Sequence, residues 1–130
     1  MIVLDASAAI DWLLQTAAGQ RIETRIFSGK ESLHAPHLLD LEVAQVLRRL
    51  VLQGSVTAVR ADQAIRDLLD LRVHRYPHIL LISRIWQLRH NFSAYHASYI
   101  ALAEAIGAVL LTRDQRLASA AGHVAKVEFF

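Results

Sequence analysis

The 130-residue sequence contains no cysteine. This excludes a disulfide framework, a thiolate nucleophile and a cysteine-ligated metal, and it allows a reducing compartment. Glycine and proline are also scarce, at five and two residues, whereas 54% of the residues are hydrophobic. Such a composition excludes a collagen-like repeat, a low-complexity linker and a disordered tail. We expect one domain, residues 1–130, built around a single core.

Long hydrophobic runs are lacking as well. The longest stretch without Asp, Glu, Lys or Arg is His90 to Ala103, and it includes His96. A membrane span needs roughly 20 apolar residues, so this stretch is too short. The first residues, Met1 to Asp5, lack the basic and apolar regions of a secretory signal. We therefore expect a cytoplasmic protein that is not inserted in a membrane.

Acidic residues are missing from about a quarter of the chain, between Leu71 and Ala103. The formal net charge is only +2, which by itself indicates no partner. Arginine supplies twelve of the 14 basic residues, and its planar fork suits bidentate contact with phosphate. One interpretation is a surface that binds phosphate groups, and the other is an ordinary solvated helix face. The candidate phosphate-binding residues are Arg72, Arg75, Arg84, Arg89 and Arg113.

Short apolar segments alternate with helical patterns along the chain. Buried strands are predicted at Met1–Leu4 and Ala108–Leu111, with weaker candidates at Ser32–Ala35 and Val124–Phe129. Helices are predicted over 38–52, 57–71, 79–90 and 94–106, with a further short helix over 115–118. This alternation predicts an α/β fold of three α/β/α layers, with a small, mainly parallel central sheet flanked by helices.

Three acidic residues are candidates for one site. In a parallel α/β sheet, ligands bind outside the carboxyl ends of the strands, where Asp5 and Asp114 lie. Glu42 lies about one turn inside a predicted helix, on a different face from Asp40. Three adjacent carboxylates repel one another unless a cation or a proton balances them, so Mg²⁺ or Mn²⁺ is the expected occupant.

Each acid also has a structural interpretation. Asp5 and Asp114 both precede helices and can act as N-caps, and Glu42 can be a solvated helix residue. The occurrence of all three at one edge of the sheet favours the metal site.

With these residues in place, the sequence resembles the PIN-domain ribonucleases and, among them, the VapC-type toxins of bacterial toxin-antitoxin pairs. The similarity covers essentially the whole chain in four segments that occur in the family's order. The matching segments are Ile2–Ala8, Ala35–Val43, Leu88–Ala108 and Leu110–Asp114.

The resemblance implies a function and partners. It implies a metal-dependent endoribonuclease in which Asp5, Glu42 and Asp114 form the acidic cluster, with Ser7 and Thr112 as supporting hydroxyls. It also implies an RNA substrate and a homodimer. A cognate VapB-like antitoxin is implied as well; its C-terminal segment would occupy the cleft, and toxin and antitoxin would form a higher assembly.

One position departs from the family pattern, because His96 stands where the family has an aspartate. Loss of a carboxylate is expected to weaken Mg²⁺ binding, whereas Mn²⁺ or Zn²⁺ tolerates a nitrogen ligand better. Alternatively, a protonated His96 replaces the cation beside an aspartate, or His96 packs to one side with Ile100.

The leading hypothesis is an active ribonuclease with His96 as an auxiliary catalytic residue. The alternative is a catalytically weakened PIN-fold protein that binds RNA and antitoxin. A DNA- or rRNA-processing nuclease without an antitoxin is a third hypothesis.

Overall fold

The structure, a computed structural model, describes all residues from Met1 to Phe130. Its centre is a five-stranded sheet in the order β3-β2-β1-β4-β5, and every neighbouring pair of strands is parallel. The strands are β1 (Ile2–Leu4), β2 (Leu33–Pro36), β3 (Val73–Tyr76), β4 (Val109–Thr112) and β5 (Lys126–Phe129). The predicted parallel sheet is therefore confirmed.

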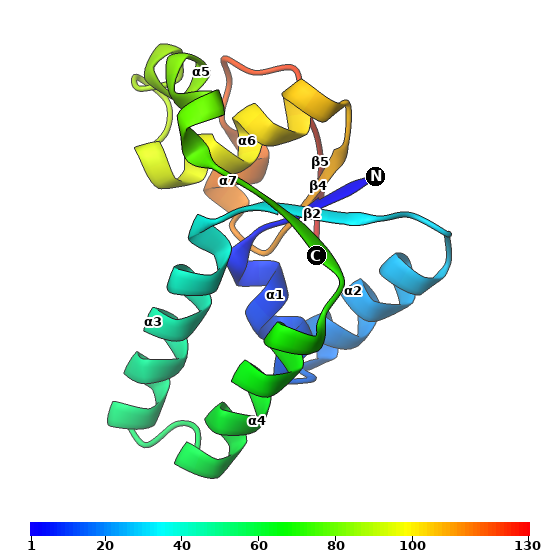
Figure 1. The fold of residues 1–130 in the computed structure, drawn as a ribbon, viewed down its shortest axis with the longest axis vertical. Helices are drawn as coiled ribbons and strands as arrows, with labels where there is room; N and C mark the ends of the chain where they lie inside the picture. Colours follow the sequence, from blue (N-terminus) through cyan, green and yellow to red (C-terminus); the bar gives the residue numbers. More distant parts are fainter.

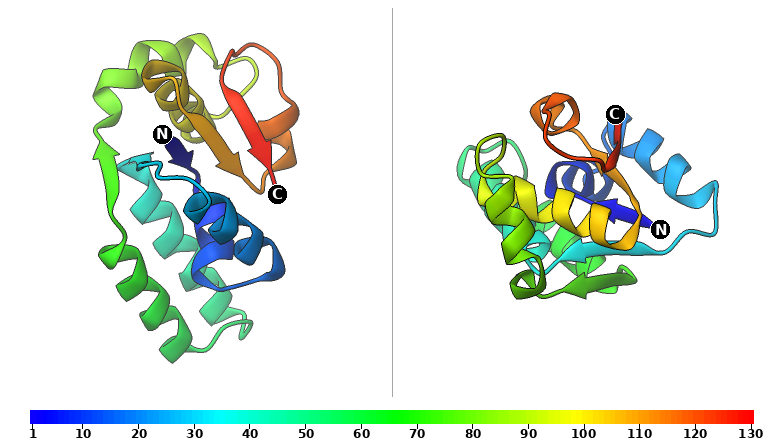
Figure 2. Two further views of the ribbon diagram at one scale, coloured as in Figure 1. Left: turned by 90° about the vertical axis from the view of Figure 1, so that its right-hand side faces the viewer. Right: turned by 90° about the horizontal axis from the view of Figure 1, so that it is seen from above.

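Helices cover both faces of the sheet (Figure 1). They are α1 (Ala6–Leu13), α2 (Ala17–Phe27), α3 (Leu38–Leu52), α4 (Ala58–Asp70), the 3₁₀ turn η1 (His78–Leu81), α5 (Ile82–Gln87), α6 (Ala94–Ile106) and α7 (Gln115–Ser119). Figure 2 shows α5 and α6 on one side of the sheet and α1 to α4 on the other. This arrangement confirms the three-layer α/β/α prediction. None of the helices has the length and hydrophobicity needed to span a bilayer.

The central strand β1 is the most deeply buried part of the sheet. Ile2, Val3 and Leu4 are each fully inaccessible to solvent, because β1 lies between β2 and β4 with helices on both faces. Such continuous apolar strands are typical of parallel sheets that are covered twice. The burial of β1 fixes the residue that follows it, Asp5, at the carboxyl edge of the sheet.

The predicted helices over 38–52 and 94–106 are confirmed at both ends. Gly107 ends α6 with a φ of 63°, the left-handed conformation that glycine adopts at low cost. Thr57 caps α4 through a hydrogen bond from the backbone N–H of Arg60. These local signals were readable because capping and helical spacing depend on neighbouring residues.

Three elements differ from the sequence-based expectation. The helix predicted over 79–90 is shorter, since residues 78–81 form the turn η1 and α5 ends at Gln87. Helix α2 was not predicted, and neither was β3, an edge strand that is only partly buried. β3 pairs in register with β2, an interaction distant in sequence that a local pattern does not reveal.

Candidate metal and nucleic-acid site

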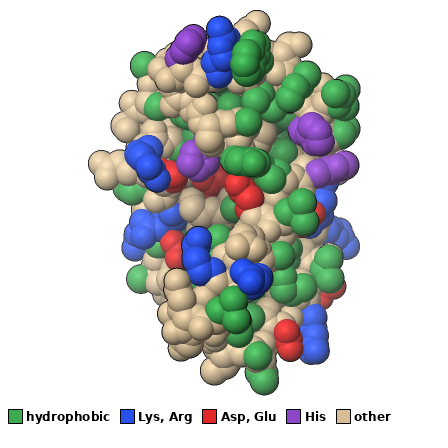
Figure 3. Space-filling model, turned by 90° about the vertical axis from the view of Figure 1, so that its left-hand side faces the viewer, with side chains coloured by type: hydrophobic (Ala, Val, Ile, Leu, Met, Phe, Trp, Pro, Cys, Tyr) green, Lys and Arg blue, Asp and Glu red, His purple; other side chains and the backbone are tan.

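The three predicted acids line one cleft at the carboxyl edge of the sheet. Asp5 follows β1, Asp114 lies two residues after β4, and Glu42 lies on α3. The cleft has a volume of about 680 Å³, and His96 on α6 also lines it. Figure 3 shows carboxylates gathered beside a histidine on this face, with basic side chains around them.

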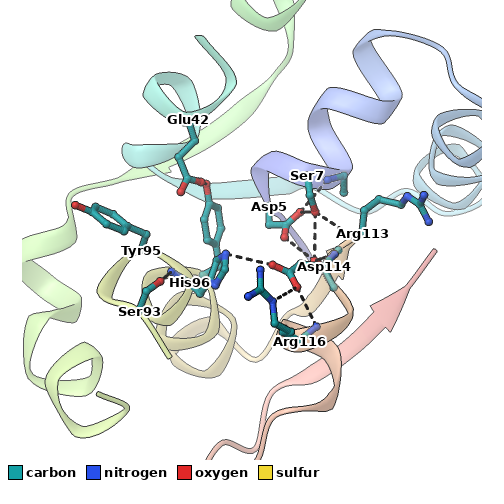
Figure 4. Close-up of polar contacts among 12 residues, drawn as sticks. Asp5, Ser7, Glu42, Ser93, Tyr95, His96, Arg113, Asp114 and Arg116 are labelled. Carbon is teal, nitrogen blue, oxygen red and sulfur yellow. Dashed lines mark hydrogen bonds and ion pairs between the residues drawn. The ribbon is translucent and has the colours of Figure 1, made fainter. Parts of the chain in front are cut away.

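Asp5 is the most enclosed of these acids, with 3% of its surface exposed. Its Oδ1 accepts hydrogen bonds from the Ser7 hydroxyl at 2.7 Å and from the backbone N–H of Ala8 at 2.9 Å. Its Oδ2 accepts one from the Thr112 hydroxyl at 2.6 Å (Figure 4). Both Ser7 and Thr112, which the resemblance implies as supporting hydroxyls, thus donate to Asp5.

Opposing effects act on the pKa of Asp5. Burial raises it above the ordinary aspartate value, and the charge of Glu42 adds to that effect. The hydrogen bonds from Thr112, Ala8 and Ser7 act in the opposite direction. A nearby cation would favour the charged form still further.

Asp114 holds a more open position than Asp5. Its Oδ1 accepts a hydrogen bond from the backbone N–H of Arg116, which makes it the N-cap of α7. Its Oδ2 lies 3.4 Å from Nε2 of His96, so this imidazole faces the cleft (Figure 4). Asp5 and Asp114 therefore both have the capping role that was the structural interpretation of their positions, and both also face the cleft.

Glu42 approaches from the opposite wall of the cleft. Its Oε2 accepts a hydrogen bond from the Tyr99 hydroxyl at 2.6 Å. Asp40, two residues earlier, pairs instead with Arg75 through two hydrogen bonds on another face of α3. The predicted division between the two acids of this helix is confirmed.

The donor chemistry suits a hard divalent cation, because three carboxylates line one cleft and Asp5 is surrounded by donors. However, no three His, Asp or Glu side chains lie close enough together to hold one metal ion as they stand. The residues fit a metal by type and by shared cleft. Their side chains are not gathered into a complete coordination sphere.

The predicted RNA-binding arginines are dispersed over the surface. Arg75, Arg84 and Arg113 pair with Asp40, Glu104 and Asp11, respectively. The guanidinium of Arg89 lies over the Trp86 ring, and Arg72 is exposed on the short connection before β3. None of these five lines the acidic cleft.

Two other arginines do line the cleft. Arg49 projects from α3 and Arg116 from α7, and both are exposed. Sequence reasoning missed them because it looked for phosphate-binding arginines mainly in the acid-free segment, although Arg116 lies only two residues after Asp114. Arg49 lies seven residues after Glu42, which places it two turns along the same helix, and this spacing is the signal that was available.

Comparisons with known proteins agree with this arrangement. Residues 2–123 match the PIN domain family. Ribonuclease VapC9 of Mycobacterium tuberculosis is 45% identical over 117 residues, covering 90% of this chain and 88% of the relative.

Two solved structures share the fold. PAE2754 from Pyrobaculum aerophilum superposes with a TM-score of 0.69 at 25% identity, covering 91% of this chain and 77% of the other. VapC20 of Mycobacterium tuberculosis, described as a Sarcin-Ricin loop cleaving toxin, gives a TM-score of 0.68 at 20% identity, covering 95% and 97%. The chain belongs to the PIN domain family and, within it, to the VapC ribonucleases.

Proposed function

We propose that this protein is a divalent-metal-dependent endoribonuclease that acts as the toxin of a VapBC-type pair. The observation that carries the proposal is the buried Asp5 carboxylate, which receives three hydrogen bonds and faces Glu42 and Asp114 across one cleft. Burying an acid is costly, and the cost falls when hydrogen-bond donors and a cation offset its charge. The name ribonuclease carried by VapC9 supports RNA as the substrate class.

The residues that would hold Mg²⁺ or Mn²⁺ are Asp5, Glu42 and Asp114. A bound cation of this kind supplies an activated water and stabilises charge that develops on a phosphodiester. Ser7 and Thr112 fix the orientation of Asp5, since each donates a hydrogen bond to one of its oxygens. His96 would act beside Asp114 as an auxiliary ligand or as a group that orients water.

An acidic cleft repels a polyanion, so basic groups must hold the RNA. Arg49 and Arg116 are suited to this role, because both are exposed at the cleft that contains the acids. The five arginines identified from the sequence would extend that contact only if RNA competes with their present partners. Contacts to phosphate position a nucleic acid without reading its bases.

Partners are part of the proposal. The description of VapC20 as a toxin supports a cognate VapB-like antitoxin, with a segment that occupies the cleft. Several large apolar side chains of η1 and α5 are exposed, and such patches are typical of protein interfaces; they support a homodimer and a higher assembly with the antitoxin. These side chains are Ile79, Leu80, Ile82 and Trp86. An RNA substrate agrees with a cytoplasmic location.

One observation favours a second candidate function. The His96 imidazole lies 3.4 Å from Asp114, where a protonated ring would neutralise one of the three acids. In that case the protein would bind RNA and antitoxin with little or no cleavage.

A single experiment separates the two functions. Cleavage of a structured RNA is measured with Mg²⁺ and with Mn²⁺ for the wild type, Asp5→Ala and His96→Asp. The nuclease proposal expects metal-dependent cleavage by the wild type and its loss in Asp5→Ala. If the wild type is as inactive as Asp5→Ala while His96→Asp cleaves, the protein is the weakened binding module.

A further inference from the structure

Tyr99 is a buried residue whose one polar atom reaches the acidic cleft. Only 1% of its surface is exposed, and it lies on α6 three residues after His96, so one helix face delivers both side chains. The Tyr99 hydroxyl donates to Oε2 of Glu42 at 2.6 Å, a short distance typical of a bond to a charged acceptor. This contact joins α6 to α3 across the cleft.

The Tyr99 hydroxyl has a defined role as the donor in this contact. A phenolic hydroxyl carries one proton that it can donate, whereas an ionised carboxylate only accepts. The hydrogen bond therefore runs from Tyr99 to Oε2 of Glu42.

Glu42 needs such a partner because nothing else in the protein fixes it. Its side chain is half-buried on an exposed part of α3 and forms no ion pair with a basic residue. A free glutamate loses considerable rotamer freedom when it is held in one position. The bond from Tyr99 restrains Oε2 and leaves Oε1 without a protein donor, facing a cleft that Asp5 and Asp114 also line.

We propose that Tyr99 is a positioning residue, which holds Glu42 ready to bind the divalent cation. The inference rests on the proposed function, since it assigns Tyr99 a role toward the same acidic site. It differs from a packing role in one respect: the hydroxyl oxygen, and not the ring, determines metal affinity. Partners that orient metal ligands affect metal affinity by about ten- to a hundredfold when they are removed.

The test is a double-mutant cycle between Tyr99→Phe and Glu42→Gln, with Mn²⁺ affinity measured by calorimetry and RNA cleavage as a second readout. Tyr76→Phe is the matched control, because it removes a hydroxyl that is hydrogen-bonded to His34 outside the cleft. Circular dichroism verifies that each variant is folded. Phenylalanine keeps the buried ring of Tyr99, so the core is filled in every variant.

The expected result is a loss of Mn²⁺ affinity of about ten- to a hundredfold in Tyr99→Phe, and wild-type affinity in Tyr76→Phe. Adding Tyr99→Phe to Glu42→Gln should change affinity no further, because the residues act as one unit. The inference is overturned if Tyr99→Phe binds Mn²⁺ like the wild type, or if its cost is unchanged in the Glu42→Gln background. If the wild type neither binds Mn²⁺ nor cleaves RNA, the proposed function fails and the inference with it.

Discussion

Asp5 and His34 are polar residues buried beside neighbouring strands of the sheet, and they differ in the hydrogen-bond partners that surround them. Asp5 follows β1 and is 3% exposed, whereas His34 lies within the neighbouring strand β2 and is 6% exposed. Burial raises the pKa of Asp5 and lowers the pKa of His34, so in both cases it disfavours the charged form. The hydrogen-bond partners of the two groups are different in kind.

His34 is satisfied as a neutral ring. Its Nε2 lies 2.7 Å from the Ser32 hydroxyl and its Nδ1 lies 2.8 Å from the Tyr76 hydroxyl. A neutral imidazole needs one donor and one acceptor, and a hydroxyl can be either. The stacked ring of His74, 5.0 Å away, adds a second group that opposes protonation. This cluster is complete and ties β2 to the edge strand β3.

Asp5, in contrast, is surrounded by donors. A backbone N–H and two hydroxyls point at its two oxygens, which is the environment of a carboxylate. The fold therefore buries an acid among hydrogen-bond donors, and two further acids line the same cleft. The partners of His34 are those of a structural residue, whereas under the proposed function the Asp5 carboxylate binds a cation.

Asp5→Asn is expected to have the largest effect on this comparison. Removing the charge should lower metal-dependent RNA cleavage by about a hundredfold or more, because the proposed cation loses its most enclosed ligand. Thermal stability without metal should be retained or should rise, since a buried charge is removed. Cleavage kinetics and thermal melts measure both quantities.

Asp40→Asn is the control for that prediction, because Asp40 pairs with Arg75 away from the cleft. The pKa of Asp5 is higher in the folded protein than in the unfolded chain. The stability of the metal-free protein should therefore fall as pH rises from the unfolded-state pKa to the folded-state pKa. The Asp5→Asn variant should lack this component. Undiminished cleavage by Asp5→Asn would contradict the account.

His96→Asp is expected to increase the metal affinity of the acidic cleft. The substitution adds a carboxylate beside Asp114 and removes the imidazole that lies 3.4 Å from it. Mg²⁺ affinity should rise by about tenfold, and more than Mn²⁺ affinity, because Mg²⁺ prefers oxygen ligands. Calorimetric titration with each metal measures the difference. Equal affinities in wild type and variant would show that position 96 lies outside the coordination sphere.

Arg49→Ala and Arg116→Ala test whether these two arginines bind RNA phosphates at the acidic cleft. Each should weaken RNA binding a few-fold and reduce the dependence of log affinity on log salt by about 0.7 for each phosphate that is no longer neutralised. Arg48→Ala is a neighbouring control on α3, and this residue lies outside the cleft. Fluorescence anisotropy at several salt concentrations gives the slopes. A larger change in Arg84→Ala would assign RNA binding to the acid-free segment instead.

Tyr76→Phe is expected to have the smallest effect and to act on stability alone. Loss of its hydrogen bond to His34 should cost about 1 kcal/mol of unfolding free energy. Cleavage should remain at the wild-type level, because this cluster is separate from the cleft. Chemical denaturation and a cleavage assay measure the two effects. Loss of cleavage in a fully folded variant would contradict the separation of the two clusters.

The pH dependence of the unfolding free energy should contain a contribution from the His34 cluster. Because the folded pKa of His34 is lowered, the unfolded chain binds more protons below about pH 6.5, and stability falls as pH decreases from there through the folded pKa. His34→Asn should show a smaller loss of stability between about pH 7 and pH 5. A loss of stability equal to that of the wild type would assign it to other groups.

Local patterns in the sequence predicted much of the fold. β1, α3 and α6 could be predicted because apolar spacing, caps and Gly107 are local signals. The edge strand β3 could not be predicted, since it is only partly buried and its formation depends on pairing with β2.

The acids of the candidate site were predicted from strand ends and from the family resemblance, but their partners were not. Tyr99 looked like one more apolar residue of a buried helix, and its bond to Glu42 joins residues far apart in sequence. The same holds for the pairing of Arg84 with Glu104, which occupies a side chain predicted to meet phosphate.

The central proposal is that the buried Asp5 carboxylate binds a divalent cation. Anomalous diffraction from crystals soaked in Mn²⁺ tests it most directly. The expected result is a peak about 2.1 Å from a carboxylate oxygen of Asp5, with Glu42 and Asp114 turned toward it. A peak that leaves Asp5 uncontacted, or no peak in crystals of protein that cleaves RNA, would contradict the claim.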